Sequence, residues 1–164
     1  MFVFHLVLLY TVFMTFKSFD IELLHICRRV SVPLARFGLF VVFFWFGFLK
    51  LFGLSPANPL VEALLNSVMP FMSFGTFIIF FGMFECIIGI LFLIKGLERV
   101  AILMLFVHMI TTLMPLFLLP QIAWSGFMIP TLEGQYMIKN ILIIAAGIGI
   151  AAHLHPLKKG HHIC

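Results

Sequence analysis

The stretch FFGMFECIIGILFL, from Phe80 to Leu93, contains a single charged residue, Glu85. Such a run can form the core of a soluble protein or cross a lipid bilayer, and a carboxylate is costly in both unless protein groups surround it. The composition of the whole chain decides between the two. Of the 164 residues, 63% are hydrophobic and 10% are charged, and the mean hydropathy is +1.23. The apolar share is well above that of soluble domains, so the sequence predicts an integral membrane protein.

Four apolar runs are long enough to cross about 30 Å of hydrocarbon. They are Leu34–Phe52, Phe71–Ile94, Val100–Leu119 and Ile138–Leu154. Runs of this length without a ten-residue alternating pattern predict helices and not barrel strands, because a backbone in lipid must satisfy its own hydrogen bonds. The expected fold is all-α: an integral membrane four-helix bundle within a domain covering residues 17–157.

Lysine and arginine predict the orientation of this bundle. They lie before or at the start of the first run, in the short loop between the second and third runs, and after the fourth: Lys17, Arg28, Arg29, Arg36, Lys95, Arg99, Lys158 and Lys159. The other two loops, Gly53–Pro70 and Pro120–Met137, contain neither residue type. The positive-inside rule therefore puts both ends of the bundle, including a tail at residues 158–164, in the cytoplasm. The net charge of +4 reports topology and gives no indication of nucleic-acid binding.

The N-terminal residues Met1–Phe16, MFVFHLVLLYTVFMTF, form a hydrophobic extension. They lack the basic region and the cleavage site of a signal peptide. As a helix they would reach about 24 Å, which is marginal for a span. Two interpretations are open, a short fifth membrane helix and a helix lying in the cytoplasmic interface.

Cysteine and histidine spacing gives no sign of a metal or thiol centre. Cys27, Cys86 and Cys164 lie far apart without a C-x-x-C pair, which argues against a thiol-disulfide oxidoreductase and a thiolate metal site. The C-terminal histidines show no metal-ligand spacing; they are His153, His155, His161 and His162. The sequence therefore predicts no bound metal, and it carries no haem or flavin signature.

The two outer loops differ in pattern. Between the first two runs, apolar residues recur at helical spacing with Glu62 and Asn66 on the other side, which predicts a short amphipathic helix lying in the outer interface. The apolar residues are Leu60, Val61, Leu64, Leu65 and Val68. The loop before the fourth run carries Trp124 and Tyr136 as expected interface anchors.

The second run carries a glycine every seven residues: Gly75, Gly82, Gly89 and Gly96. Seven residues are nearly two helical turns, so these glycines predict one seam against which another helix packs closely. Glu85 lies three residues after Gly82, on or beside this seam. We therefore expect Glu85 to face protein.

Glu85 and His108 are expected at the same depth. At about 1.5 Å per residue, Glu85 lies about 13 Å and His108 about 12 Å from the cytoplasmic side, on consecutive helices that a tight loop makes neighbours. Trp45 lies only slightly deeper. One interpretation is a proton relay or a polar contact for a small ligand such as a quinone head group. The other is an interhelical hydrogen bond with a structural role only.

Further polar residues are expected near these groups. Thr111 and Thr112 continue the His108 face outward, although back-bonding of threonine to the helix explains them equally well. A second polar group is predicted at the outer end, as a set of loop-to-helix charge pairs or a ligand site: Lys50, Glu62, Glu133, Gln135, Tyr136, Lys139 and Asn140.

Three segments resemble the DoxX-like membrane protein family. RVSVPLARFGLFVVFFWFGFLK (Arg29–Lys50) looks like its first helix, FGMFECIIGILFL (Phe81–Leu93) its second, and TLEGQYMIKNILIIAAGIGIAAH (Thr131–His153) the turn and last helix. The resemblance covers about Ser31 to Leu157. The positions that match the family pattern are Arg36, Trp45, Gly47, Lys50, Glu85, Gly89, Gly134, Lys139 and Asn140.

The resemblance implies a four-helix bundle in the bacterial cytoplasmic (inner) membrane. The family includes a subunit of a thiosulfate:quinone oxidoreductase and members resembling reactive-chlorine-resistance proteins, so it implies an accessory or quinone-contacting subunit of a membrane redox or oxidative-stress system. Quinone is then the expected cofactor, and a soluble or membrane redox protein the expected partner besides the lipid bilayer. Two alternatives are a small-solute or proton-coupled carrier and a non-catalytic scaffold.

Overall fold

The computed structural model describes the backbone of residues 2–156 and the side chains of residue 17 and residues 19–156. The chain divides into two compact units, Met1–Leu34 and Ala35–Cys164. By length and composition, four helical stretches in the described residues can cross a membrane: Phe19–Leu51, Phe74–Leu93, Glu98–Leu118 and Leu132–Ala151. The predicted all-α, multi-pass membrane architecture is confirmed at this level. The predicted cytoplasmic tail at residues 158–164 lies outside the described residues.

Helix α1 (Phe2–Leu51) is longer than the sequence pattern predicted. Residues 17–32 contain no glycine and no proline, so nothing in them ends a helix. Pro33 lies inside α1, as membrane-spanning helices tolerate. Residues 2–16 are therefore the start of α1 and not a separate helix.

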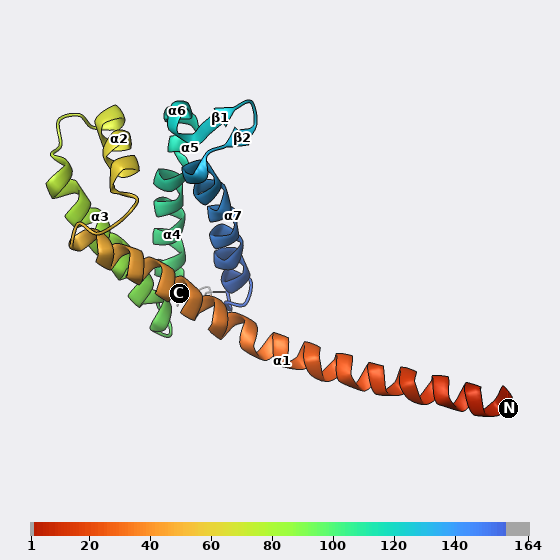
Figure 1. Cartoon of the computed structure of the whole chain (residues 1–164). Helices are drawn as coiled ribbons and strands as arrows, with labels where there is room; N and C mark the ends of the chain where they lie inside the picture. The colour runs from red at the N-terminus through yellow and green to blue at the C-terminus, as the bar shows by residue number, and fades with distance from the viewer. Residues whose placement is uncertain (1, 157–164) are drawn as a thin grey trace, which may run out of the picture. The chain divides into compact units, whose positions relative to one another are not determined.

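The second unit contains a bundle formed by residues 35–51 of α1 together with α3 (Phe74–Leu93), α4 (Glu98–Leu113) and α7 (Leu132–Ala151) (Figure 1). Hydroxyl groups cap two of these helices, because Ser73 accepts a hydrogen bond from the Thr76 amide and Thr131 accepts one from the Gly134 amide. Side chains from all four segments form one buried apolar core: Leu39, Phe43, Ile88, Phe92, Ala101, Ile102, Leu105, Met109 and Ile150.

Short elements gather at one end of this bundle (Figure 1). They are α2 (Asn58–Val68), α5 (Pro115–Leu118), α6 (Pro120–Ala123) and a hairpin of β1 (Trp124–Gly126) and β2 (Ile129–Pro130). Pro115 and Pro120 each begin a helix, where a missing N–H group costs nothing. Trp124 donates a hydrogen bond from Nε1 to the Leu116 carbonyl at 3.0 Å, whereas Tyr136 is exposed.

Two of the four seam glycines make the predicted close helix contact. A Cβ atom at Gly82 would lie 2.8 Å from the Gly47 carbonyl oxygen, and one at Gly89 would lie 2.8 Å from the Phe44 amide nitrogen, both on α1. The prediction is wrong for Gly75 and Gly96, because a Cβ at either would meet no described atom within 4 Å. Gly96 lies beyond the end of α3, in the turn before α4, and its φ of 91° is a conformation that glycine adopts easily. Of the four glycines, Gly82 and Gly89 therefore mark the close approach of α1 and α3.

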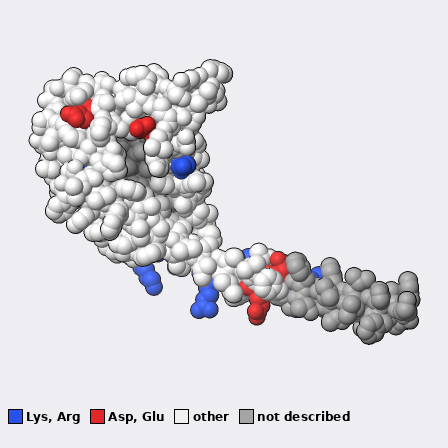
Figure 2. All heavy atoms as spheres, viewed as in Figure 1, with Lys and Arg blue, Asp and Glu red and all other residues white. Residues whose placement is uncertain are grey.

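The exterior of the second unit is mostly apolar. Figure 2 shows few Lys, Arg, Asp or Glu side chains on the visible face of the bundle. Large apolar side chains are exposed along its helices, for example Phe80, Leu103, Ile110 and Leu142. An exterior of this kind is stable in lipid and not in water.

Candidate functional site

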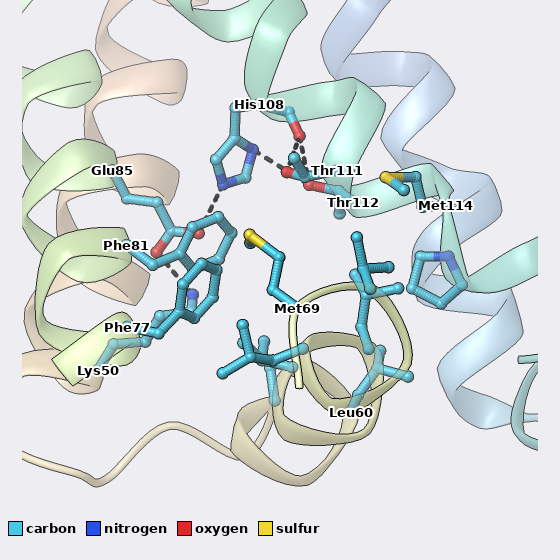
Figure 3. Close-up of a pocket in the computed structure, with 16 residues that line it drawn as sticks. Lys50, Leu60, Met69, Phe77, Phe81, Glu85, His108, Thr111, Thr112 and Met114 are labelled. Carbon is cyan, nitrogen blue, oxygen red and sulfur yellow. Dashed lines mark hydrogen bonds and ion pairs between the residues drawn. The ribbon is translucent and has the colours of Figure 1, made fainter. Parts of the chain in front are cut away.

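A cavity of about 160 Å3 lies between α2 and the facing parts of α3 and α4 (Figure 3). Polar groups line one end of it: Lys50 from α1, Glu85 from α3, and His108, Thr111 and Thr112 from α4. The remaining lining is apolar and includes Ala57, Leu60, Val61, Leu64, Leu65, Val68, Met69, Phe77, Phe81, Met114 and Pro115. An apolar chamber with a few polar groups at one end is typical of sites for small ligands.

Helix α2 forms one wall of this cavity. It has the predicted amphipathic pattern, with Leu65 buried and with Glu62 and Asn66 exposed. Its apolar face lines the cavity and packs against α3 and α5, and its place in the outer interface stays a prediction. Local periodicity cannot identify these apolar protein partners.

Glu85 is the centre of the polar end. Its Oε1 lies 2.8 Å from Nε2 of His108, and its Oε2 accepts a hydrogen bond from Nζ of Lys50 at 2.6 Å. All three residues are about 95% buried. The predicted proximity of Glu85 and His108 is therefore present, and Glu85 faces protein. Whether the pair serves a function stays a prediction.

Lys50 lies in this cluster, although the sequence predicted a different position for it. It was expected at the outer end with the loop charges, but it is buried and bonded to Glu85. The reason is the close approach of Gly47 to Gly82, which brings the next turn of α1 against the turn of α3 that carries Glu85. A signal for this contact was in the sequence, because each helix has a glycine three residues before its charged residue.

Aromatic rings enclose His108. The rings of Phe81 and Phe84 stack on the imidazole with centroids 5.1 and 6.2 Å away, and Phe43 contacts it edge-on at 5.2 Å. Phe81 also lies under the Lys50 ammonium, 5.5 Å from Nζ. Electron-rich ring faces favour a nearby cation. The polar end is thus shielded from lipid by aromatic side chains from α1 and α3.

Thr112 allows His108 to hold two different proton arrangements. Its Oγ1 lies 3.1 Å from Nδ1 of His108 and 2.9 Å from the His108 carbonyl oxygen. With a neutral imidazole, Nε2–H donates to Glu85 and the Thr112 hydroxyl donates to Nδ1. With a protonated imidazole, Nδ1–H donates to Thr112, whose hydroxyl hydrogen then turns to the carbonyl. His108 can therefore gain or lose a proton without leaving a ring nitrogen unbonded.

Thr111 has a simpler role. Its hydroxyl donates to the His108 carbonyl oxygen at 2.7 Å, which is the back-bonding alternative considered from the sequence. It has no hydrogen bond to the imidazole among the described contacts. Thr111 and Thr112 both line the cavity, but only Thr112 orients the ring.

The Lys50 ammonium has donor capacity beyond Glu85. An ammonium group carries three N–H groups, and among the described residues the only hydrogen bond from Nζ is the one to Glu85. Because Lys50 lines the cavity, its other N–H groups can bind an oxygen acceptor on a ligand. The paired charges of Lys50 and Glu85 cancel, which makes the cluster tolerable at membrane depth.

Three other candidate residues lie away from this cluster. Trp45 was expected near the level of Glu85, but its side chain is 61% exposed, because it lies two residues from Gly47 and so on another face of α1. Lys139 is exposed, with Nζ 5.3 Å from the centroid of the Tyr136 ring. Asn140 is half-buried and does not line the cavity. The outer polar group is therefore not assembled as a single site.

Arg36 belongs to a second, partly buried ion pair that the sequence did not predict. Its Nη1 donates to Oε1 of Glu98 at 2.6 Å, and its Nε donates to the Phe92 carbonyl at 2.7 Å. Glu98 also accepts a hydrogen bond from the Gly96 amide at 2.7 Å. Arg36 thus connects α1, through two hydrogen bonds, to the end of α3 and the start of α4. The sequence did not predict this ion pair, because Glu98 lies among other charged residues in the short loop predicted between the second and third runs.

No protein-family model, curated protein or solved structure matches this chain. The resemblance to DoxX-like proteins therefore stays a hypothesis that depends on the three quoted segments.

Proposed function

We propose that this multi-pass membrane protein is DoxX-like and binds a quinone-class ring in the cavity beside Glu85, as an accessory subunit of a redox or oxidative-stress system in the bacterial inner membrane. The observation that carries the proposal is the buried Lys50–Glu85–His108 cluster at the end of an apolar cavity. Ionisable groups are rare within membrane helices and mark functional sites more often than structural ones.

The size of the cavity supports a single ring as the ligand. Its volume is about 160 Å3, and an apolar cavity of about 150 Å3 in another protein binds benzene. Phe77 and Phe81 from α3 and Leu64 from α2 line the chamber and would contact the ring faces. An apolar tail on the ring would extend into the lipid around the bundle.

The donors at the polar end support a ring that carries carbonyl oxygens. An N–H group of Lys50 can donate to such an oxygen without leaving Glu85, because the ammonium has donors to spare. The His108 and Thr112 pair can hold a proton close to the ligand in either of two arrangements. A bound quinone supplies the redox chemistry, and this chain's residues bind it, shield it from water and keep a proton available.

Several positions that carry the resemblance also build this site. Lys50 and Glu85 form the central ion pair, and Gly47 and Gly89 make the close contacts between α1 and α3. These coincidences support the proposal. The other positions that carry the resemblance do not line the cavity; they are Arg36, Trp45, Gly134, Lys139 and Asn140.

A binding measurement tests the proposal. The purified chain in nanodiscs is titrated with a short-tailed benzoquinone, and the affinity is compared for the original chain, Lys50→Met and Lys139→Met. Lys139→Met is the matched control, because it removes the same charge from an exposed side chain. We expect Lys50→Met to weaken binding by about 10- to 100-fold, since a hydrogen bond to a charged group contributes about 1.5–3 kcal/mol.

A second variant separates loss of the site from loss of the fold. Lys50→Met combined with Glu85→Gln leaves no buried unpaired charge, so it should fold while failing to bind the quinone. Equal affinity in all variants, or no binding to the original chain, would refute the ligand assignment. A proton-coupled carrier is the second candidate, because the same buried charges are typical of proton pathways. It predicts solute-dependent proton flux in vesicles, abolished by the double substitution.

A further inference from the structure

We propose that the β1–β2 hairpin is an interfacial anchor whose tip, Phe127–Met128–Ile129, inserts into the head-group region of the lipid bilayer. The hairpin takes no part in the cavity or in the Lys50–Glu85 and Arg36–Glu98 ion pairs, so the inference is independent of the proposed ligand.

The tip consists of large apolar side chains with almost no protein around them. The exposed fractions are 96% for Phe127, 74% for Met128 and 61% for Ile129. A single exposed apolar residue is ordinary on a protein surface, but three in succession at a loop tip are not. Their contact with water would be costly, since full burial of a side chain of this size is favourable.

Met128 adds a second unusual feature, in its backbone. Its φ of 58° makes it the only non-glycine residue with positive φ in the described part of the chain. Glycine or asparagine is usual at such a turn position, because a Cβ atom is strained there. Compared with glycine, a methionine at this position makes the backbone less stable but adds an apolar side chain. A local cost of this kind points to a function for the side chain.

The base of the hairpin is firmly held. The Ser125 hydroxyl donates to the Ile129 carbonyl at 3.2 Å, and the Thr131 hydroxyl donates to the Ile122 carbonyl at 2.6 Å. Trp124 donates to the Leu116 carbonyl. The tip is therefore presented in one orientation, which reduces the entropic cost of inserting it.

The position of the hairpin identifies the bilayer as its partner. Thr131 connects β2 to α7, a span whose own length of 20 residues corresponds to about 30 Å, so its first residue lies near the membrane boundary. In Figure 1 the hairpin reaches sideways past the end of α7. No charged residue occurs from Leu116 to Leu132, and exposed Phe117 and Leu132 continue the apolar surface on either side. A neutral, aromatic and apolar surface at this level is typical of the lipid interface.

Spin labelling of the full chain in phosphatidylcholine vesicles tests the proposal. In a background with Cys27→Ser, Cys86→Ala and Cys164→Ser, single labels are attached through Phe127→Cys, Asn66→Cys and Ile148→Cys. Asn66, on the exposed polar face of α2, is the water-facing control, and Ile148, exposed on α7, is the lipid-facing control. Collisions of the label with oxygen, which concentrates in lipid, are compared with collisions with a water-soluble nickel complex.

We expect the label at position 127 to collide more with oxygen than with nickel, with a ratio between those of the two controls. A ratio equal to that at position 66 would place the tip in water and overturn the proposal. Protection from both reagents would indicate that protein, such as a second copy of the chain, covers the tip, and would also overturn it. Circular dichroism of each labelled variant verifies that the fold is retained.

Discussion

Two ion pairs connect α1 to its neighbours, and they differ in what surrounds them. Arg36 and Glu98 are partly buried at the turn between α3 and α4, where the Phe92 carbonyl accepts a further hydrogen bond from Arg36 and the Gly96 amide donates one to Glu98. Lys50 and Glu85 are buried at the end of a cavity, and Lys50 keeps donors that no described acceptor uses. Backbone groups surround the first pair, whereas the second lies beside an apolar cavity.

Under the proposed function, similar chemistry serves stability at the first pair and ligand binding at the second. In each pair a basic residue of α1 meets a glutamate 2.6 Å away. They differ in what else the basic side chain contacts: Arg36 also binds a backbone carbonyl, whereas Lys50 also lines the apolar cavity. The three predictions below test this distinction, with stability and ligand affinity as separate readouts.

The largest effect is expected for Glu85→Leu, which removes the carboxylate that Lys50 and His108 share. Lys50 then carries a buried charge without a partner, which lowers the free energy of unfolding by about 3–5 kcal/mol. Unfolding in detergent micelles, followed by circular dichroism, measures the loss. Glu62→Leu is the control, because Glu62 lies on the exposed face of α2.

A double variant sharpens this result. Adding Lys50→Met to Glu85→Leu removes both charges, so most of the lost stability should return while quinone binding stays absent. If Glu85→Leu alone were as stable as Glu62→Leu, the charged Lys50–Glu85 pair would not exist in the folded protein.

An intermediate effect is expected for Arg36→Met. The substitution removes hydrogen bonds to Glu98 and to the Phe92 carbonyl, and hydrogen bonds to charged groups contribute about 1.5–3 kcal/mol. Stability should fall by this amount without a change in quinone affinity. Arg29→Met, at an exposed position, is the matched control. A loss of affinity at unchanged stability would reverse the roles assigned to the two pairs.

The smallest effect is expected for Thr112→Val, which removes the hydroxyl beside Nδ1 of His108. Hydrogen bonds between groups in membrane helices contribute about 0.6 kcal/mol on average, so we expect little change in stability and a severalfold loss of quinone affinity. Thr111→Val is the control, because Thr111 bonds only to the His108 carbonyl. Calorimetric titration of both variants measures the difference. Equal affinity in the two would show that orientation of the imidazole is unimportant.

Features that depend on composition and local period could be predicted before the fold was known. Long apolar runs predicted the membrane spans, the spacing of leucines in α2 predicted an amphipathic helix, and the depths of Glu85 and His108 predicted their proximity. Each follows from the thickness of the bilayer or from the rise and period of a helix. These quantities can be compared with short stretches of sequence one at a time.

Which groups join these elements depends on how the helices pack against one another. The register of α1 on α3, set where Gly47 meets Gly82, brought Lys50 to Glu85, turned Trp45 outward and left Gly75 outside the contact. The turn after α3 brought Glu98 to Arg36 in the same way. The register of two packed helices depends on the close fit of surfaces that are far apart in the sequence. No local pattern in either helix specifies which residues of one will face which residues of the other.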